Sequence, residues 1–137
     1  NGYQKGRCFY CFRDILIARG PESNVDVDHF FPLALNQFPE FVQMNLNGVW
    51  NLVLACEDCN RGVGGKFMRV PTTRYLERLH CRNQFYIESH HPLRETLMNQ
   101  TGQLELHRRD FLQRVHKEAT ARLLHHWKPA HEQAPVF

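Results

Sequence analysis

The chain has 137 residues, of which 42% are hydrophobic, and it contains no apolar run long enough to cross a membrane. This length suits one domain, or one domain with a helical extension; no signal-peptide pattern follows Asn1, and a start without methionine suggests a fragment of a larger protein. Residues 1–60 carry four basic and seven acidic side chains and residues 61–137 carry 13 and seven, an asymmetry that favours a polyanionic partner such as nucleic acid, with ordinary surface charge as the alternative.

The first half of the chain is predicted to consist of short strands between two cysteine pairs. The strands are predicted at residues 12–18, 25–29 and 49–55. In the second of them Val25 and Val27 alternate with Asp26 and Asp28, so the two carboxylates are expected to project from one face. Residues 36–48 have turn-forming residues at both ends and are expected to form a loop with a short helix.

The second half of the chain is predicted to be helical. A short helix is expected to open at Asn60 and to end before Pro71. Three longer helices are then expected: one from Thr72 or Thr73, one from Pro92, and one between the Thr101-Gly102 break and Pro129, with Trp127 on its apolar face.

Four of the five cysteines form two C-x-x-C pairs, Cys8 with Cys11 and Cys56 with Cys59. Each pair can point two thiolates at one tetrahedral cation, so we predict a structural Cys₄ zinc site, with four buried free thiols as the alternative. The 44 residues between the pairs exceed the roughly 15–20 of a zinc ribbon, which implies an inserted subdomain. Paired C-x-x-C motifs are more typical of zinc binding in a reducing compartment than of a disulfide framework. We therefore expect an intracellular, cytoplasmic protein. Cys81 lies outside both pairs and is expected to be buried.

The Asp28-His29 pair is the first candidate for chemistry. Eight of the nine histidines lie at position 80 or later, which leaves His29 alone in the acidic half. A neutral imidazole can take a proton from water, and a neighbouring carboxylate can hold a hard divalent cation. Phosphodiester hydrolysis needs such a base beside a Lewis acid, whereas the alternative is a structural histidine at the end of a strand.

Two asparagines extend this set. Asn51 is the polar residue in the apolar run from Val49 to Ala55, and a buried amide needs partners, so it is expected to pin a loop. Asn60 directly follows Cys59, and its amide oxygen could ligate a divalent cation or its side chain could cap a helix.

In this order, the motifs resemble those of the HNH endonuclease family. The resemblance covers residues 8–66 and rests on C-F-Y-C, V-D-H-F-F-P-L, W-N-L-V-L-A-C and C-E-D-C-N-R-G, followed by Lys66. It implies an α+β fold whose ββα-metal, treble-clef-like core is a β-hairpin and a helix around one divalent metal, held by Cys₄ zinc knuckles. The chain then divides into an HNH nuclease core with the zinc site, residues 1–70, and an α-helical C-terminal extension, residues 71–137, which packs on the core or on a partner domain.

The resemblance also implies the role of each matched residue. His29 corresponds to the general base, and Asn51 to the residue that holds the hairpin loop. Asp28 and Asn60 correspond to the ligands of a catalytic Mg²⁺ or Mn²⁺, and Asp26 is a weaker alternative ligand on strand alternation alone.

The implied activity is metal-dependent endonucleolytic hydrolysis of DNA, most naturally double-stranded, by the nuclease module of a restriction, defence or mobile-element protein. The basic residues expected to contact flanking phosphates are Arg61, Lys66, Arg69 and Arg74. Two alternatives remain at this point. One is a non-catalytic, zinc-ordered nucleic-acid-binding module, and the other is a protein-interaction domain whose helices are the functional part.

Overall fold

The computed structural model describes residues 3–16, 24–123, 125–130, 132 and 137. The helices are α1 (Glu57–Arg61), α2 (Thr73–Glu88), α3 (Arg94–Thr101) and α4 (Glu105–Arg122). The strands are β1 (Val25–His29), β2 (Leu52–Cys56), β3 (Val70–Pro71) and β4 (His126–Trp127), and three short 3₁₀ turns are η2 (Leu33–Gln37), η3 (Pro39–Phe41) and η4 (Val49–Asn51). The predicted mixture of small sheets and helices is therefore confirmed.

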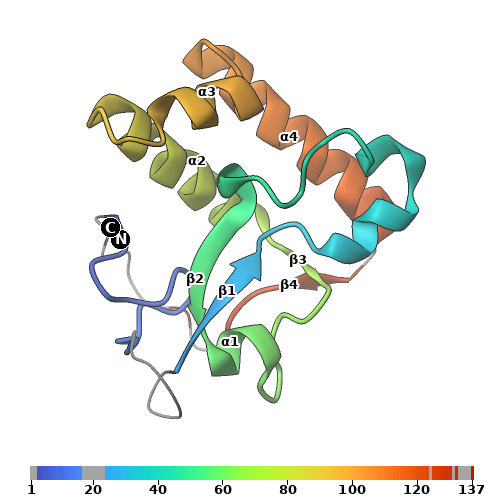
Figure 1. Ribbon diagram of the computed structural model, residues 1–137. Coiled ribbons are helices and arrows are strands. Elements are labelled where there is room, and N and C mark those ends of the chain that lie inside the picture. The colour runs from blue at the N-terminus through green and yellow to red at the C-terminus, as the bar shows by residue number, and fades with distance from the viewer. Residues whose placement is uncertain (1–2, 17–23, 124, 131, 133–136) are drawn as a thin grey trace.

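The centre of the molecule is the antiparallel pair of β1 and β2. The register joins Val25 to Cys56 and His29 to Leu52, so the second cysteine knuckle lies at the open end of the pair. Helix α1 follows β2 directly, because the Cys56 sulfur accepts the Cys59 backbone N–H at 3.5 Å and caps the first turn. Figure 1 shows α1 at one end of the β1–β2 pair and α2, α3 and α4 gathered at the other.

The predicted strand at residues 49–55 begins later than expected. Residues 49–51 form η4, in which the Asn51 backbone N–H donates to the Gly48 carbonyl at 3.0 Å, and β2 starts at Leu52. The register explains the difference, because β1 ends opposite Leu52 and leaves no partner strand for the residues before it.

The strand predicted at residues 12–18 is wrong over its described part, 12–16, which forms a single bridge from Asp14 to Arg7 instead. Phe12 has φ of +64° and its N–H donates to the Cys8 carbonyl at 3.0 Å, so the knuckle turns the backbone there. Residues 17 and 18 lie outside the described residues.

The short helix expected to open at Asn60 is α1, and it begins three residues earlier, at Glu57. Asn60 is thus in its last turn. Gly62 ends the helix, and a Cβ there would lie only 2.7 Å from the Asp58 Cα, which accounts for glycine at this position. The expected loop at residues 36–48 contains the end of η2 and all of η3.

The three longer helices are present with shifted ends. Helix α2 begins after Thr72 as expected, whereas α3 begins at Arg94 rather than at Pro92. Helix α4 ends at Arg122, and Trp127 lies in β4, which pairs in parallel with β3. Contacts of the Trp127 indole hold this part of the chain outside the helix, because its Nε1 donates to the Gly64 carbonyl at 2.8 Å and its ring packs on Tyr10.

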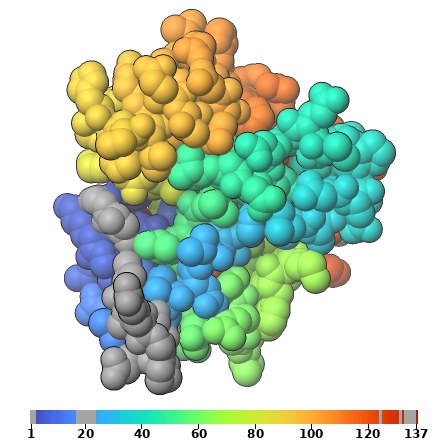
Figure 2. Space-filling model, in the orientation of Figure 1, coloured from blue at the N-terminus to red at the C-terminus, as the bar shows by residue number. Residues whose placement is uncertain are grey.

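The helices and the β1–β2 region share one hydrophobic cluster. Trp50 of η4 packs edge-on against Phe111 of α4, with ring centroids 4.9 Å apart, and Tyr10 contacts Tyr75 of α2 at 5.9 Å. Figure 2 shows the helices forming a continuous surface over the upper part of the molecule. None of the helices in the described part of the chain is long and apolar enough to span a membrane.

Candidate functional site

The four knuckle cysteines converge on one point. The sulfur atoms of Cys8, Cys11, Cys56 and Cys59 all lie within 4.8 Å of one another, and all four residues are buried. Among the described residues, no other group of three or more histidine, cysteine or acidic side chains is drawn together in this way. A closed set of four thiolate donors fits structural zinc, which is borderline soft and tetrahedral.

The four thiols also shift one another's pKa values. Hydrogen bonds from Cys56, Cys59 and Cys8 hold the pKa of Cys11 well below its usual range, while the pKa values of Cys8 and Cys59 are raised by their sulfur neighbours. Thiols crowded in this way compete for protons, and a bound cation would relieve the competition. Cys81 lies outside the cluster and is exposed on α2, so the prediction that it is buried is wrong.

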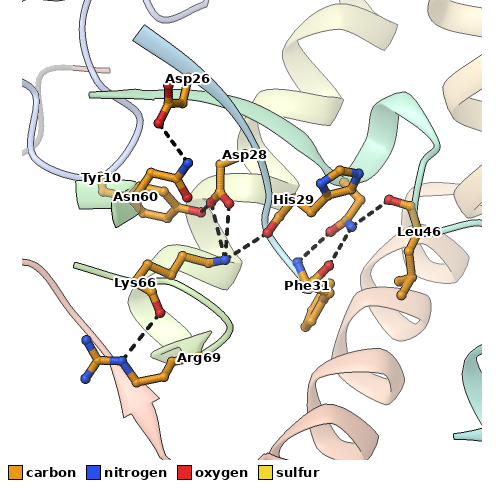
Figure 3. Close-up of polar contacts among 10 residues, drawn as sticks. Tyr10, Asp26, Asp28, His29, Phe31, Leu46, Asn60, Lys66 and Arg69 are labelled. Carbon is orange, nitrogen blue, oxygen red and sulfur yellow. Dashed lines mark hydrogen bonds and ion pairs between the residues drawn. The ribbon is translucent and has the colours of Figure 1, made fainter. Parts of the chain in front are cut away.

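Asp28 lies in a buried polar cluster rather than on an open surface (Figure 3). The Tyr10 hydroxyl donates a hydrogen bond to Asp28 Oδ2 at 2.6 Å. The Lys66 Nζ lies 3.3 Å from Asp28 Oδ2 and 3.4 Å from Oδ1. The same ammonium donates to the His29 carbonyl at 2.8 Å. Lys66 therefore joins the end of β1 to the segment that follows α1.

Burial opposes both charges of this pair. It raises the pKa of Asp28 and lowers the pKa of Lys66, and the attraction between the two groups offsets each shift. The Lys66 side chain is 0% exposed, so it is not at the surface where phosphate would lie. The expected phosphate contact for Lys66 does not fit this position, and its ammonium serves the buried carboxylate instead.

His29 occupies the last position of β1, and its ring lies on the opposite side of that strand from the Asp28 carboxylate (Figure 3). Strand alternation is the cause, since neighbouring side chains point to opposite faces. The His29 Nε2 lies 2.8 Å from Asn47 Oδ1. An amide oxygen only accepts, so this bond fixes the hydrogen on Nε2 and leaves Nδ1 with the free lone pair.

Asn51 is fully buried, and its side-chain amide is fully engaged. Its Oδ1 accepts from the Phe31 N–H at 2.8 Å, and its Nδ2 donates to the carbonyls of Phe31 at 3.0 Å and of Leu46 at 2.9 Å. These bonds tie the segment after β1 to the segment before η4. The Asn51 amide thus holds two segments, the one that follows His29 and the one that precedes Asn47.

Asn60 reaches β1 from α1, but its hydrogen-bond partner is Asp26 rather than Asp28. The Asn60 Nδ2 donates to Asp26 Oδ2 at 3.0 Å, and the Arg61 Nε donates to the same oxygen at 2.8 Å. Asp26 and Asp28 share one face of β1, as alternation predicts. Asn60 Oδ1 accepts no hydrogen bond from the described residues.

The other cations expected to contact phosphate are also engaged within the chain. Arg61 pairs with Asp26 and Glu57, although its side chain remains 59% exposed. Arg69 donates to the carbonyls of Gly65 and Lys66, and Arg74 pairs with Glu132 at 3.2 Å. Among these cations, Arg61 is the one nearest to Asn60 in the chain.

Three supports of the site were missed in the sequence: Asn47, Arg78 and Arg82. Arg78 of α2 donates to the carbonyls of Phe9 and Tyr10 in the first knuckle. Arg82, one turn later, donates to three carbonyls at 2.6 to 3.1 Å, those of Leu52, Val49 and Trp50. The available signal was their four-residue spacing on the apolar face of a predicted helix, where a charged side chain needs buried partners.

Comparison with protein-family models, with curated proteins and with solved structures finds no significant match for this chain.

Proposed function

We propose that this protein is a metal-dependent endonuclease that hydrolyses phosphodiester bonds of DNA. The observation that carries the proposal is the set of oxygen donors between β1 and α1. Asp26 and Asp28 lie on one face of β1. Asn60 of α1 is anchored to Asp26 through its nitrogen, which leaves its carbonyl oxygen without a hydrogen bond from the described residues. Carboxylate and amide oxygens are the donors that Mg²⁺ and Mn²⁺ prefer.

The chemistry of these donors fits a divalent cation held by Asp28 and Asn60. A carboxylate has about four lone-pair directions, and Tyr10 and Lys66 occupy only some of those on Asp28. When bound, Mg²⁺ or Mn²⁺ would polarise the scissile phosphate and stabilise the leaving oxygen.

The protein's own residues account for the remaining requirements of hydrolysis. His29 takes the proton of the attacking water at Nδ1, because Asn47 holds the hydrogen on Nε2. Asn51 fixes the loops that carry both residues, which keeps the base in one orientation. Lys66 contacts both the Asp28 carboxylate and the carbonyl of His29, so one ammonium ties together the backbone of the base and the metal-binding carboxylate.

The proposal is tested by incubating the zinc-loaded protein with supercoiled plasmid, with Mg²⁺, with Mn²⁺ and without either. Nicked or linear plasmid that forms only with added divalent metal is the expected result. Absence of cleavage of both DNA and RNA in every metal would remove the nuclease proposal.

The second candidate is a non-catalytic, zinc-ordered nucleic-acid-binding module. The ion pair of Lys66 with Asp28 favours it, since the ammonium already neutralises the carboxylate that a metal would need. A gel shift of plasmid DNA without cleavage, unchanged by His29→Ala, would select this function over the first.

A further inference from the structure

The segment after α1, residues 62–69, presents apolar side chains to solvent; we call it the Phe67 loop. Val63, Phe67 and Met68 are 109%, 55% and 63% exposed, whereas most large apolar side chains of this chain lie in the core. Three large apolar side chains exposed within six residues are typical of a binding surface. In Figure 2 the light-green surface of this segment lies beside the blue surface of β1, on the face in view.

The backbone holds this loop open rather than letting it collapse. The Lys66 N–H donates to the Cys59 carbonyl at 2.6 Å, and the Phe67 N–H donates to the Asn60 carbonyl at 2.8 Å. Further along, Trp127 donates to the Gly64 carbonyl. The loop is thus fastened to the zinc knuckle, to a proposed metal ligand and to β4.

Phe67 has φ of +48°, the left-handed region that a bulky side chain rarely adopts. Such conformations persist only where the surroundings impose them, and they concentrate at functional sites. Here the two hydrogen bonds to the end of α1 impose it, and the result is an exposed aromatic ring one residue from the buried Lys66.

Charge identifies the partner of the loop. Residues 59–76 contain four basic side chains and no acidic one. Lys66 is buried on Asp28 and is not available to phosphate. Arg61 remains 59% exposed, and Arg69 donates to backbone carbonyls rather than to a carboxylate, so these two cations flank the loop. An exposed aromatic ring within a basic segment suits a nucleic-acid strand, since phosphates meet the cations and any base can stack on the ring.

We infer that Phe67 stacks on a nucleobase next to the scissile phosphate, with Met68 and Val63 filling the space beside it. The inference rests on the proposed nuclease function and deepens it, because it specifies the substrate. A ring that stacks on a base face requires that base to be unstacked from its neighbour. The preferred substrate is therefore single-stranded DNA, or duplex DNA that is nicked, mismatched or kinked at the cleavage position.

The test measures binding of a fluorescein-labelled single-stranded oligonucleotide and of the matching duplex, in a His29→Ala background that prevents cleavage. Phe67→Ala and Phe67→Leu should each weaken binding of the single strand by about tenfold, because one base–aromatic contact is lost. Phe85→Ala is the matched control, since Phe85 is also exposed but lies on α2. It should leave the affinity unchanged.

A second measurement reports stacking directly. In Phe67→Trp, the fluorescence of the introduced indole should be quenched as the protein becomes saturated with the single strand. Trp50 and Trp127 are buried, so their fluorescence should not change. Phe85→Trp should show no quenching. Unchanged zinc content and thermal midpoint in each variant separate loss of contact from loss of fold.

Equal affinities of the parent and Phe67→Ala, or an unquenched Phe67→Trp, would overturn the stacking inference. Metal-dependent cleavage by the wild-type chain together with that result would leave the nuclease proposal intact. Phe67-dependent binding without any cleavage would support stacking and remove the nuclease proposal. Absence of DNA binding altogether would remove both the nuclease proposal and the stacking inference.

Discussion

At the scale of single residues, the site is defined by which groups meet across β1. Asp28 meets Tyr10 and Lys66 on the buried face, while His29 meets Asn47 on the other. A buried carboxylate without a cation would cost several kcal/mol, so loss of the Lys66 ammonium alone should destabilise the fold whatever the chemistry.

The ion pair makes a prediction about coupling. Lys66→Met leaves the Asp28 charge buried and unpaired, and should lower the free energy of unfolding by about 3–5 kcal/mol. Asp28→Asn together with Lys66→Met should lower it by less than the sum of the single changes, with a coupling of at least about 1 kcal/mol. Urea denaturation of the two single variants and the double variant measures this. Additive effects would show that the pair does not act as one unit.

At the scale of elements, α2 holds both halves of the site. Arg78 reaches the first knuckle and Arg82 reaches η4 and β2, so one face of one helix fixes the backbone on both sides of β1. Burial lowers the pKa of Arg82 to about 10, which leaves its guanidinium protonated at neutral pH.

Arg82→Met should destabilise the fold by about 2–4 kcal/mol. Methionine fills much of the same space but removes the Arg82 donor from three carbonyls, of which that of Trp50 keeps Asn83 as a second donor and that of Val49 keeps a backbone N–H. Each unsatisfied group costs about 1–3 kcal/mol. Chemical denaturation measures the change, and the exposed Arg114→Met, on α4, is the control. A loss below about 0.5 kcal/mol would mean that these carbonyls find water instead.

The two cysteine knuckles are the second structural element that can be tested. Metal analysis of the purified protein should find about one zinc per chain, and Cys8→Ser should lose it and unfold the β1–β2 region. Cys81→Ser is the matched control, because Cys81 is exposed and outside the cluster. Protein that is folded and free of zinc, or equal zinc content in both variants, would contradict the assignment.

At the scale of the whole molecule, the described parts of residues 1–70 and 71–137 are joined by a shared core. His116 of α4 is one of the links, since its Nε2 lies 3.0 Å from the Pro71 carbonyl of β3. Burial lowers the pKa of His116, and the nearby His126 adds to the effect. Folding therefore favours the neutral ring.

This gives the molecule a predicted acid sensitivity. Below the unfolded pKa of about 6.5, the unfolded chain binds a proton that the folded chain does not, so stability is lost as pH falls through the lowered folded pKa. Between about pH 7.5 and about pH 5.5, wild type should lose more stability than His116→Gln, which keeps a donor for Pro71 without titrating. Urea denaturation at both pH values measures the difference, and equal losses would refute it.

Parts of this molecule could be predicted from sequence and parts could not. The cysteine cluster and the pinning bonds of Asn51 follow from local rules, namely paired thiols and a buried amide that must find partners. The pairing of Lys66 with Asp28 could not be foreseen, because the glycines between Asn60 and Lys66 let the chain turn back by an amount that no periodicity encodes. The donors from α2 were missed for a related reason, since a helix pattern shows which face is buried but not what lies opposite.

The role of His29 as general base is tested most directly by metal-dependent nicking of supercoiled plasmid by wild type, His29→Ala and His107→Ala. His107 is an exposed histidine of α4 and serves as the control. If His29 is the general base, its loss should slow cleavage by about 10²-fold or more, while His107→Ala cleaves like wild type. Equal cleavage rates for wild type and His29→Ala in Mg²⁺ or Mn²⁺, or inactivity of both on DNA and RNA, would contradict the account.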